Sequence, residues 1–202
     1  PVLAKASSWP RGLHGMLIVH EKDAVQVDQE RAFVLDDIYM NSDGTPASSE
    51  MSWMESVMGR LGNVIVVNGS LDSLEGEIRE NAVERWRLVN TANARTLEVT
   101  IEGARWRDIG VDGTLLPEPY EARSIYMPVG RRYDLEVIPE SEEVQLKLLL
   151  PTEDGGTTAA TIFTGTVGDE PSQITRDDEW MDWGAAPLPE LPEITQSVEL
   201  EF

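Results

Sequence analysis

Short stretches in which apolar and polar residues alternate recur along the chain. Residues 97–102 read LEVTIE and residues 132–137 read RYDLEV, with an apolar side chain at every second position. Successive side chains of a β-strand point to opposite faces, so this alternation predicts strands with one face toward a core and the other toward water. Other apolar or alternating runs predict further strands at residues 16–20, 32–39, 64–67, 86–89, 124–127, 144–150 and 161–167.

Turn signals separate these runs. Asn68-Gly69 and Asp112-Gly113 are pairs that suit turns with positive φ, and Asp43-Gly44 and Gly155-Gly156 mark further turns. About nine short strands with this spacing predict an all-β fold, either a sandwich of two sheets or a barrel.

One segment between residues 48 and 62 departs from the period of two and predicts a short helix. It offers an N-cap at Ser48 or Ser49, a closing glycine at Gly59 or Gly62, and an apolar face with helical spacing made of Met51, Met54 and Met58. Thioethers are soft ligands for Cu(I), and Met40 lies nearby in the sequence. A methionine stripe at this spacing is more typical of core packing, which we favour.

Composition and charge exclude several classes of function. The chain has 202 residues, no cysteine, and 37 acidic against 16 basic residues, for a net charge of -21. The absence of cysteine excludes disulfides, thiol catalysis, zinc thiolate sites and any copper site with a Cys ligand. The negative charge argues against nucleic acid as a partner, and it suits either a salty habitat or solubility in general. No apolar run approaches the ~20 residues that span a bilayer, so we expect no membrane span.

The sequence changes character after Gly168. It becomes rich in proline and acidic residues, which is typical of an extended linker. Trp180 and Trp183 in this linker are candidates to anchor it against the sandwich or a neighbouring domain. Residues 195–202 alternate again and resemble the first strand of a following domain.

Four sequence motifs in a fixed order carry a family resemblance. They are VVNG at residues 66–69, RWRLVNTANARTLEV at 85–99, DGTLLPEP at 112–119 and MPVGRRYDLEV at 127–137. Together they resemble the second cupredoxin-like domain of three-domain multicopper oxidases, a family that includes laccases and bacterial cuprous oxidases. GLHGMLIV at residues 12–19 is similar to the strand that closes the first domain of this family, and PLPELPEI at 187–194 to the connector into the third.

The resemblance implies a Greek-key cupredoxin-like β-sandwich with one short helix and a long C-terminal linker. Residues 1–25 would end a preceding cupredoxin domain and pack as a first strand. Residues 26–168 would form the second domain without copper ligands, and residues 169–202 the linker and first strand toward a third domain.

The function that the resemblance implies belongs to a larger parent protein. In this family, oxygen is reduced at a three-copper cluster held by His-x-His pairs between the first and third domains, and a type 1 copper in the third domain takes electrons from the substrate. The second domain supplies none of these ligands, so we expect no catalytic, cofactor-binding or metal-binding residue in this chain and copper only in the parent. Domains 1 and 3 would be its partners, in the periplasm or outside the cell.

Two alternatives stay open. In the first, the parent is a copper-free homologue that acts as a binding or scaffold module in cell division. In the second, the chain is an unrelated free-standing binding sandwich, and residues 195–202 then form an edge strand of the same domain.

The residues that could take part in chemistry also have ordinary structural explanations. His14 and His20 are the only histidines. If both lie on one strand, their six-residue spacing places them about 20 Å apart at ~3.3 Å per residue, too far to share a metal ion. Neighbouring carboxylates such as Asp36 and Asp37 point to opposite faces of a strand, so they cannot form an acid–base pair on one substrate, and we expect them to be solvated.

Arg95 is interpreted as a structural clamp. Its five donors suit several loop carbonyls or a carboxylate such as Asp112, and Asn90 and Asn93 can satisfy backbone groups where the strand bends. Binding of an anionic ligand by Arg95 is the less favoured reading.

Overall fold

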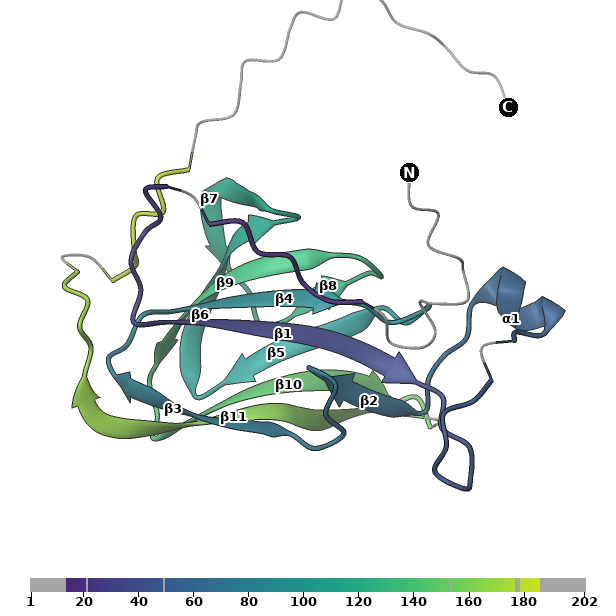
Figure 1. Ribbon diagram of the computed structural model, residues 1–202. Coiled ribbons are helices and arrows are strands. Elements are labelled where there is room, and N and C mark those ends of the chain that lie inside the picture. The colour runs from purple at the N-terminus through teal and green to yellow at the C-terminus, as the bar shows by residue number, and fades with distance from the viewer. Residues whose placement is uncertain (1–13, 21, 49, 153, 177–178, 186–202) are drawn as a thin grey trace, which may run out of the picture.

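Two β-sheets face each other in this protein (Figure 1). The structure, a computed structural model, describes residues 14–20, 22–48, 50–152, 154–176 and 179–185. The first sheet has six strands in the order β2 (Val64–Val67), β1 (Gln29–Ile38), β4 (Glu84–Asn90), β9 (Arg132–Pro139), β6 (Ala104–Val111) and β7 (Thr114–Glu121). The second has five in the order β3 (Leu74–Glu80), β11 (Thr157–Pro171), β10 (Glu143–Pro151), β5 (Leu97–Glu102) and β8 (Ile125–Met127).

Both sheets are mixed. β1 pairs with β4 and β3 pairs with β11 in parallel, whereas the other neighbours are antiparallel. These pairings bring together segments that are distant in the sequence. The predicted all-β, cupredoxin-like Greek-key sandwich with one short helix is confirmed, and a barrel is not formed.

The core lies between the two sheets and is centred on three aromatic rings. Phe33 and Trp86 from one sheet meet Phe163 from the other, with ring centroids 5.3 to 5.4 Å apart. Such tilted and edge-to-face contacts add to the hydrophobic gain from burying the rings. Arg31 and Glu84 form a buried ion pair at the border of this cluster, where Arg31 also lies 5.0 Å from the Phe163 centroid.

The predicted strands are present with one exception. Residues 16–20 are not part of a sheet, because this segment pairs with no strand in the described part of the chain. It alternates in exposure, and it runs in an extended course over the six-stranded sheet (Figure 1). Three strands were not predicted, namely β3, β6 and β7.

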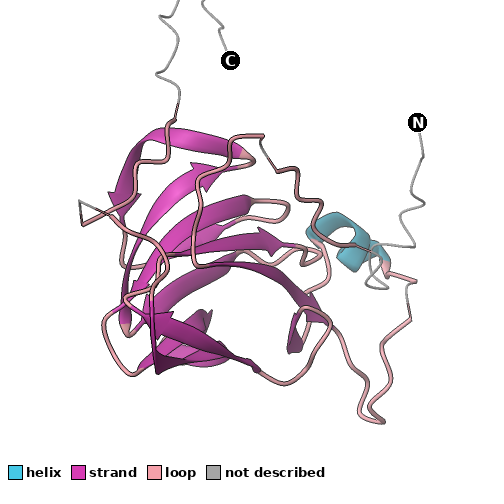
Figure 2. Ribbon diagram, turned by 60° about the vertical axis from the view of Figure 1, so that its left-hand side comes forward, coloured by secondary structure: helices cyan, strands magenta, loops and turns pink. Residues whose placement is uncertain are grey.

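Helix α1 (Trp53–Met58) projects from one end of the sandwich (Figure 2). Its N-cap is Ser52, whose side chain accepts from the Glu55 N–H while Glu55 bonds back to the Ser52 N–H. The predicted N-caps at Ser48 and Ser49 are therefore wrong, because this capping box fixes the start of the helix further along. The helix ends at Gly59, as predicted, with φ of 79°.

The proposed packing role of the methionines is also wrong. Met51 precedes the helix, and Met54 and Met58 are 59% and 72% exposed. The helix buries none of its residues, because it stands clear of both sheets. Among the described residues, no helix has the length and apolar character needed to cross a bilayer.

Candidate functional site

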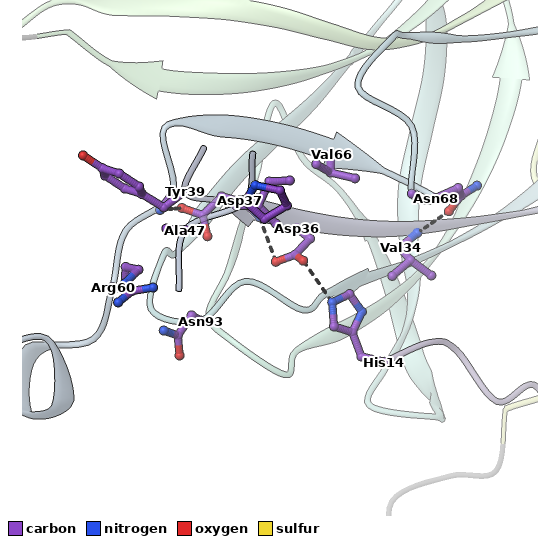
Figure 3. A pocket seen from close by; sticks show the side chains of 14 residues that line it. His14, Val34, Asp36, Asp37, Tyr39, Ala47, Arg60, Val66, Asn68 and Asn93 are labelled. Carbon is purple, nitrogen blue, oxygen red and sulfur yellow. Dashed lines mark hydrogen bonds and ion pairs between the residues drawn. The ribbon is translucent and has the colours of Figure 1, made fainter. Parts of the chain in front are cut away.

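A cavity of about 560 Å³ opens where β1, β2 and the loop after α1 meet (Figure 3). Sites for small molecules commonly have volumes of about 300–1,000 Å³ and mostly apolar walls with a few polar groups. This cavity fits that description, since Val34, Ile38 and Val66 line it together with two carboxylates, Asp36 and Asp37.

Asp36 connects the cavity wall to the N-terminal segment. Its Oδ2 lies 2.9 Å from Nε2 of His14, and its Oδ1 accepts a hydrogen bond from the Asp37 N–H. Burial raises the pKa of Asp36, and the contact with His14 opposes that shift. The residue is only 7% exposed, so the expectation of a solvated carboxylate is wrong. The His14 ring lies against this carboxylate.

Asp37 is held by a clamp that Arg95 completes. Its Oδ2 accepts hydrogen bonds from the Gly62 N–H at 2.6 Å and from Nε of Arg95 at 2.7 Å, and Arg95 also donates to the Gly62 carbonyl. The arginine thus joins the β4–β5 loop to the loop after α1, as expected of a structural clamp. The suggested partner Asp112 is wrong, because that residue stands at a turn with φ of 53° and bonds to Arg131.

The two asparagines behave differently. Asn90 donates to the carbonyls of Arg95 and Met127, so it satisfies backbone groups as predicted. Asn93 lines the cavity, and its buried Nδ2 has no hydrogen-bond partner among the described residues. The same is true of Oδ1 of Asp37. Two residues that line the cavity thus each hold one buried polar atom without a partner among the described residues.

Acid–base catalysis by the two neighbouring carboxylates is not supported by this geometry. Asp36 is engaged by His14 and Asp37 by Arg95 and Gly62. A general acid and base must both reach one substrate, and here each carboxylate is directed to a different partner. The arrangement can bind a ligand, but it does not position a nucleophile.

Among the described residues, the two histidines do not come together as ligands of one copper ion. Copper in proteins is held by imidazole and by thiolate or thioether ligands. His14 contacts Asp36, whereas Nδ1 of His20 lies 3.9 Å from Glu30, so the two histidines meet β1 at positions six residues apart. Within the described ranges, no three His, Cys, Asp or Glu side chains lie close enough together to hold a metal ion.

The two mixed sheets, with parallel β1–β4 and β3–β11 pairs, define a cupredoxin-like domain. A comparison with protein families finds a match to the multicopper oxidases over residues 18–143, more than half of the 202 residues. The chain therefore belongs to the multicopper oxidase family.

Solved structures of multicopper oxidases are similar to most of the chain. The multi-copper oxidase from Pseudomonas thermotolerans is 25% identical with a TM-score of 0.69, and the match covers 92% of this chain and 42% of that chain. The laccase-like multi-copper oxidase CueO from Ochrobactrum sp. is 21% identical with a TM-score of 0.60, covering 80% and 36%. McoA from Aquifex aeolicus is 19% identical with a TM-score of 0.59, covering 81% and 36%. The chain thus spans between 36% and 42% of the length of these oxidases.

Proposed function

We propose that this chain is the non-catalytic middle domain of a multicopper oxidase. Residues 26–168 form that domain, residues 1–25 end a preceding cupredoxin domain, and residues 169–202 lead toward a third. The proposal rests on how much of each protein the structural match covers. The match covers 92% of this chain but 42% of an oxidase with which the chain is 25% identical.

The N-terminal segment at residues 14–20 supports the division into domains. His14, Met16 and Ile18 are half-buried, whereas Leu17 and Val19 are 89% and 81% exposed. The segment is extended and apolar on both faces, and it pairs with no strand in the described part of the chain. An apolar side that stays exposed is typical of a surface that another part of the protein covers, so the segment suits contact with a preceding domain.

The role of the chain in the parent is then architectural. It holds two copper-bearing domains at the spacing that lets them share a copper cluster. The parent couples one-electron oxidation of a substrate to the reduction of oxygen to water, with copper as its cofactor. By family resemblance, we expect the parent in the periplasm or outside the cell.

Copper analysis of two proteins tests the proposal. The purified chain, incubated with copper and desalted, is expected to retain no stoichiometric metal, whereas the full-length parent retains copper and consumes oxygen with a one-electron donor. Stoichiometric copper on the chain alone would overturn the assignment as a middle domain. A parent that binds no copper would favour the scaffold alternative instead.

A further inference from the structure

The outer face of the six-stranded sheet carries a concentration of arginines. Residues 85–87 on β4 and residues 105–107 on β6 both read Arg-Trp-Arg. The central residues, Trp86 and Trp106, are 0% and 6% exposed in the core, and the strand period therefore directs the flanking arginines to the opposite face. Four of the 16 basic residues of a chain with net charge -21 thus gather on one face.

A carboxylate lies between these arginines. β9 runs between β4 and β6, and the register places Glu136 opposite Arg85 on one side and Arg107 on the other. Nε of Arg107 donates to Oε2 of Glu136 at 2.8 Å. Although it stands on the outer face of the sheet, the Glu136 side chain is 0% exposed. Another part of the molecule must therefore cover the Glu136 carboxylate.

The cover is a segment of the same chain, residues 179–185, which we call the strap. Oε1 of Glu136 accepts the backbone N–H of Met181, and Oε2 accepts the indole N–H of Trp183, both at 2.8 Å. Nη2 of Arg107 donates to the Met181 carbonyl at 2.6 Å. The Glu136 carboxylate and the Arg107 guanidinium therefore bind both the backbone and a side chain of the strap through charge-assisted hydrogen bonds.

The tryptophans of the strap pack on three of the four arginines. Trp183 is 4% exposed, and its ring lies 5.2 Å from the guanidinium carbon of Arg85. The Trp180 ring lies 4.8 Å from Arg107 and 5.1 Å from Arg105. These distances are typical of cation–π contacts, which strengthen when the cation is partly desolvated. The prediction that both tryptophans anchor the linker against the sandwich is confirmed.

One acidic residue of the strap also pairs with an arginine of the face. Glu179, at the start of the strap, forms an ion pair with Arg105, and Arg105 donates to the Glu179 carbonyl at 3.0 Å. The surface thus recognises an acidic residue, two indole rings and the main chain between them.

We propose that this arginine-rich face is a docking site for an acidic, tryptophan-containing segment, and that its occupant, the strap, fixes the direction in which the chain leaves the domain. Glu136 is the positioning residue at its centre. The inference rests on the proposed function, because a fixed direction of the departing chain matters where a following domain must keep a constant distance from this one. It explains how a domain without copper ligands could set that distance.

The effect of the strap on the freedom of the chain can be estimated. Upstream of the strap, Ser172 and Gln173 are tied to Asp28 by hydrogen bonds of 2.7 and 2.6 Å. From Gln173 to Ala185 there are about twelve residues, which as a flexible coil would spread over roughly 20 Å. While the strap is bound, Ala185 is held in one place. Release of the strap should therefore greatly widen the range of positions that Ala185 occupies.

Distance measurements between two spin labels test the proposal on the full chain. Since the chain has no cysteine, Ala159→Cys and Ala185→Cys create a single pair, one on the outside of the other sheet and one at the end of the strap. Double electron–electron resonance is expected to give a narrow distribution. Trp183→Ala, which removes a ring and a donor, and Glu136→Gln, which removes the charge, should each broaden it toward the roughly 20 Å spread of a released coil.

A matched control and three outcomes decide the result. Trp53→Ala removes a tryptophan that is 76% exposed on α1 and should leave the distribution narrow. Trp183→Ala changes only the strap, so circular dichroism should show an intact sandwich. A broad distribution before any strap mutation, or an unchanged one in both variants, would overturn the proposal. Distances between chains in samples labelled only at Ala185→Cys would show that the occupant belongs to a second copy. None of these results depends on the copper content of the parent.

Discussion

Replacement of Asp108 by asparagine should stabilise this protein at neutral pH. Asp108 lies on β6 and is 0% exposed, and its Oδ1 accepts a hydrogen bond of 3.1 Å from the Gly110 N–H. Burial, assisted by the negative charge of Asp134, raises the pKa of Asp108 from 3.8 to about 6, although Tyr120 and the Gly110 N–H oppose the shift. The native state therefore holds a carboxylate that resists ionisation.

The size and sign of the effect follow from this shift. The native pKa exceeds the unfolded value by about two units, and each unit corresponds to about 1.4 kcal/mol, so ionisation costs the native state about 3 kcal/mol above pH 6. Because the native pKa is the higher one, the native state binds more protons in this window. Stability is thus lost as the pH rises from about 4 to about 6. Asparagine keeps the acceptor for Gly110 and cannot ionise, so Asp108→Asn should remove this loss.

Urea unfolding of the unmutated chain and of Asp108→Asn, each between pH 4 and pH 7.5, measures the difference in the free energy of unfolding. The gain from Asp108→Asn should be smallest at the acid end and largest near neutrality. Asp43→Asn is the control with a flat profile, because hydrogen bonds from Thr45 lower the pKa of Asp43 below 3.8. The pH-dependent part of its contribution therefore lies below the assayed range, and this variant should be less stable than the unmutated chain by an amount that hardly changes between pH 4 and pH 7.5. A difference for Asp108→Asn that does not change with pH, or that is largest in acid, would refute the reasoning.

Three further variants probe the fold. Arg31→Met should lower the free energy of unfolding by about 3–5 kcal/mol in urea titrations, because it leaves Glu84, whose side chain is 2% exposed, as an unpaired buried charge. Gly62→Ala should reduce the thermal midpoint sharply, since the new Cβ would lie 2.5 Å from the backbone of β1; a normal melting curve would contradict this packing. Ser52→Ala should weaken helix α1 by about 1 kcal/mol and speed hydrogen exchange there, without lowering global stability, because α1 buries no residue.

The strands that could be predicted are those with an uninterrupted alternating or apolar run. β5 and β9 alternate clearly, and their turns carry the glycines that positive φ requires. β7 was missed because Pro117 and Pro119 interrupt it, yet a strand at the edge of a sheet tolerates proline. β3 was missed because Gly76 weakens its pattern. That glycine is needed where Arg31 approaches, since a Cβ there would meet its guanidinium at 2.7 Å.

The candidate site was harder to predict, because its burial comes from distant segments. Nothing local to Asp36 and Asp37 shows that His14 and the loop at Gly62 will cover them. The tryptophans of the strap could be recognised by their size in a linker. Glu136 could not, since one glutamate among 37 acidic residues carries no signature. The repeated Arg-Trp-Arg triplet was the available signal, because basic residues are scarce in this chain.

The parallel pairing of β3 with β11 has a consequence for synthesis of the protein. β11 is the neighbour of β3 in its sheet, and it begins at Thr157, long after β3 ends at Glu80. At a translation rate of about 5–20 residues per second, β3 waits roughly 4–15 seconds before its partner has been made. An unpaired strand edge invites aggregation, and charged side chains on the edge counteract it. β3 reads LEGEIRE, and its three glutamates therefore keep a growing chain soluble during this interval.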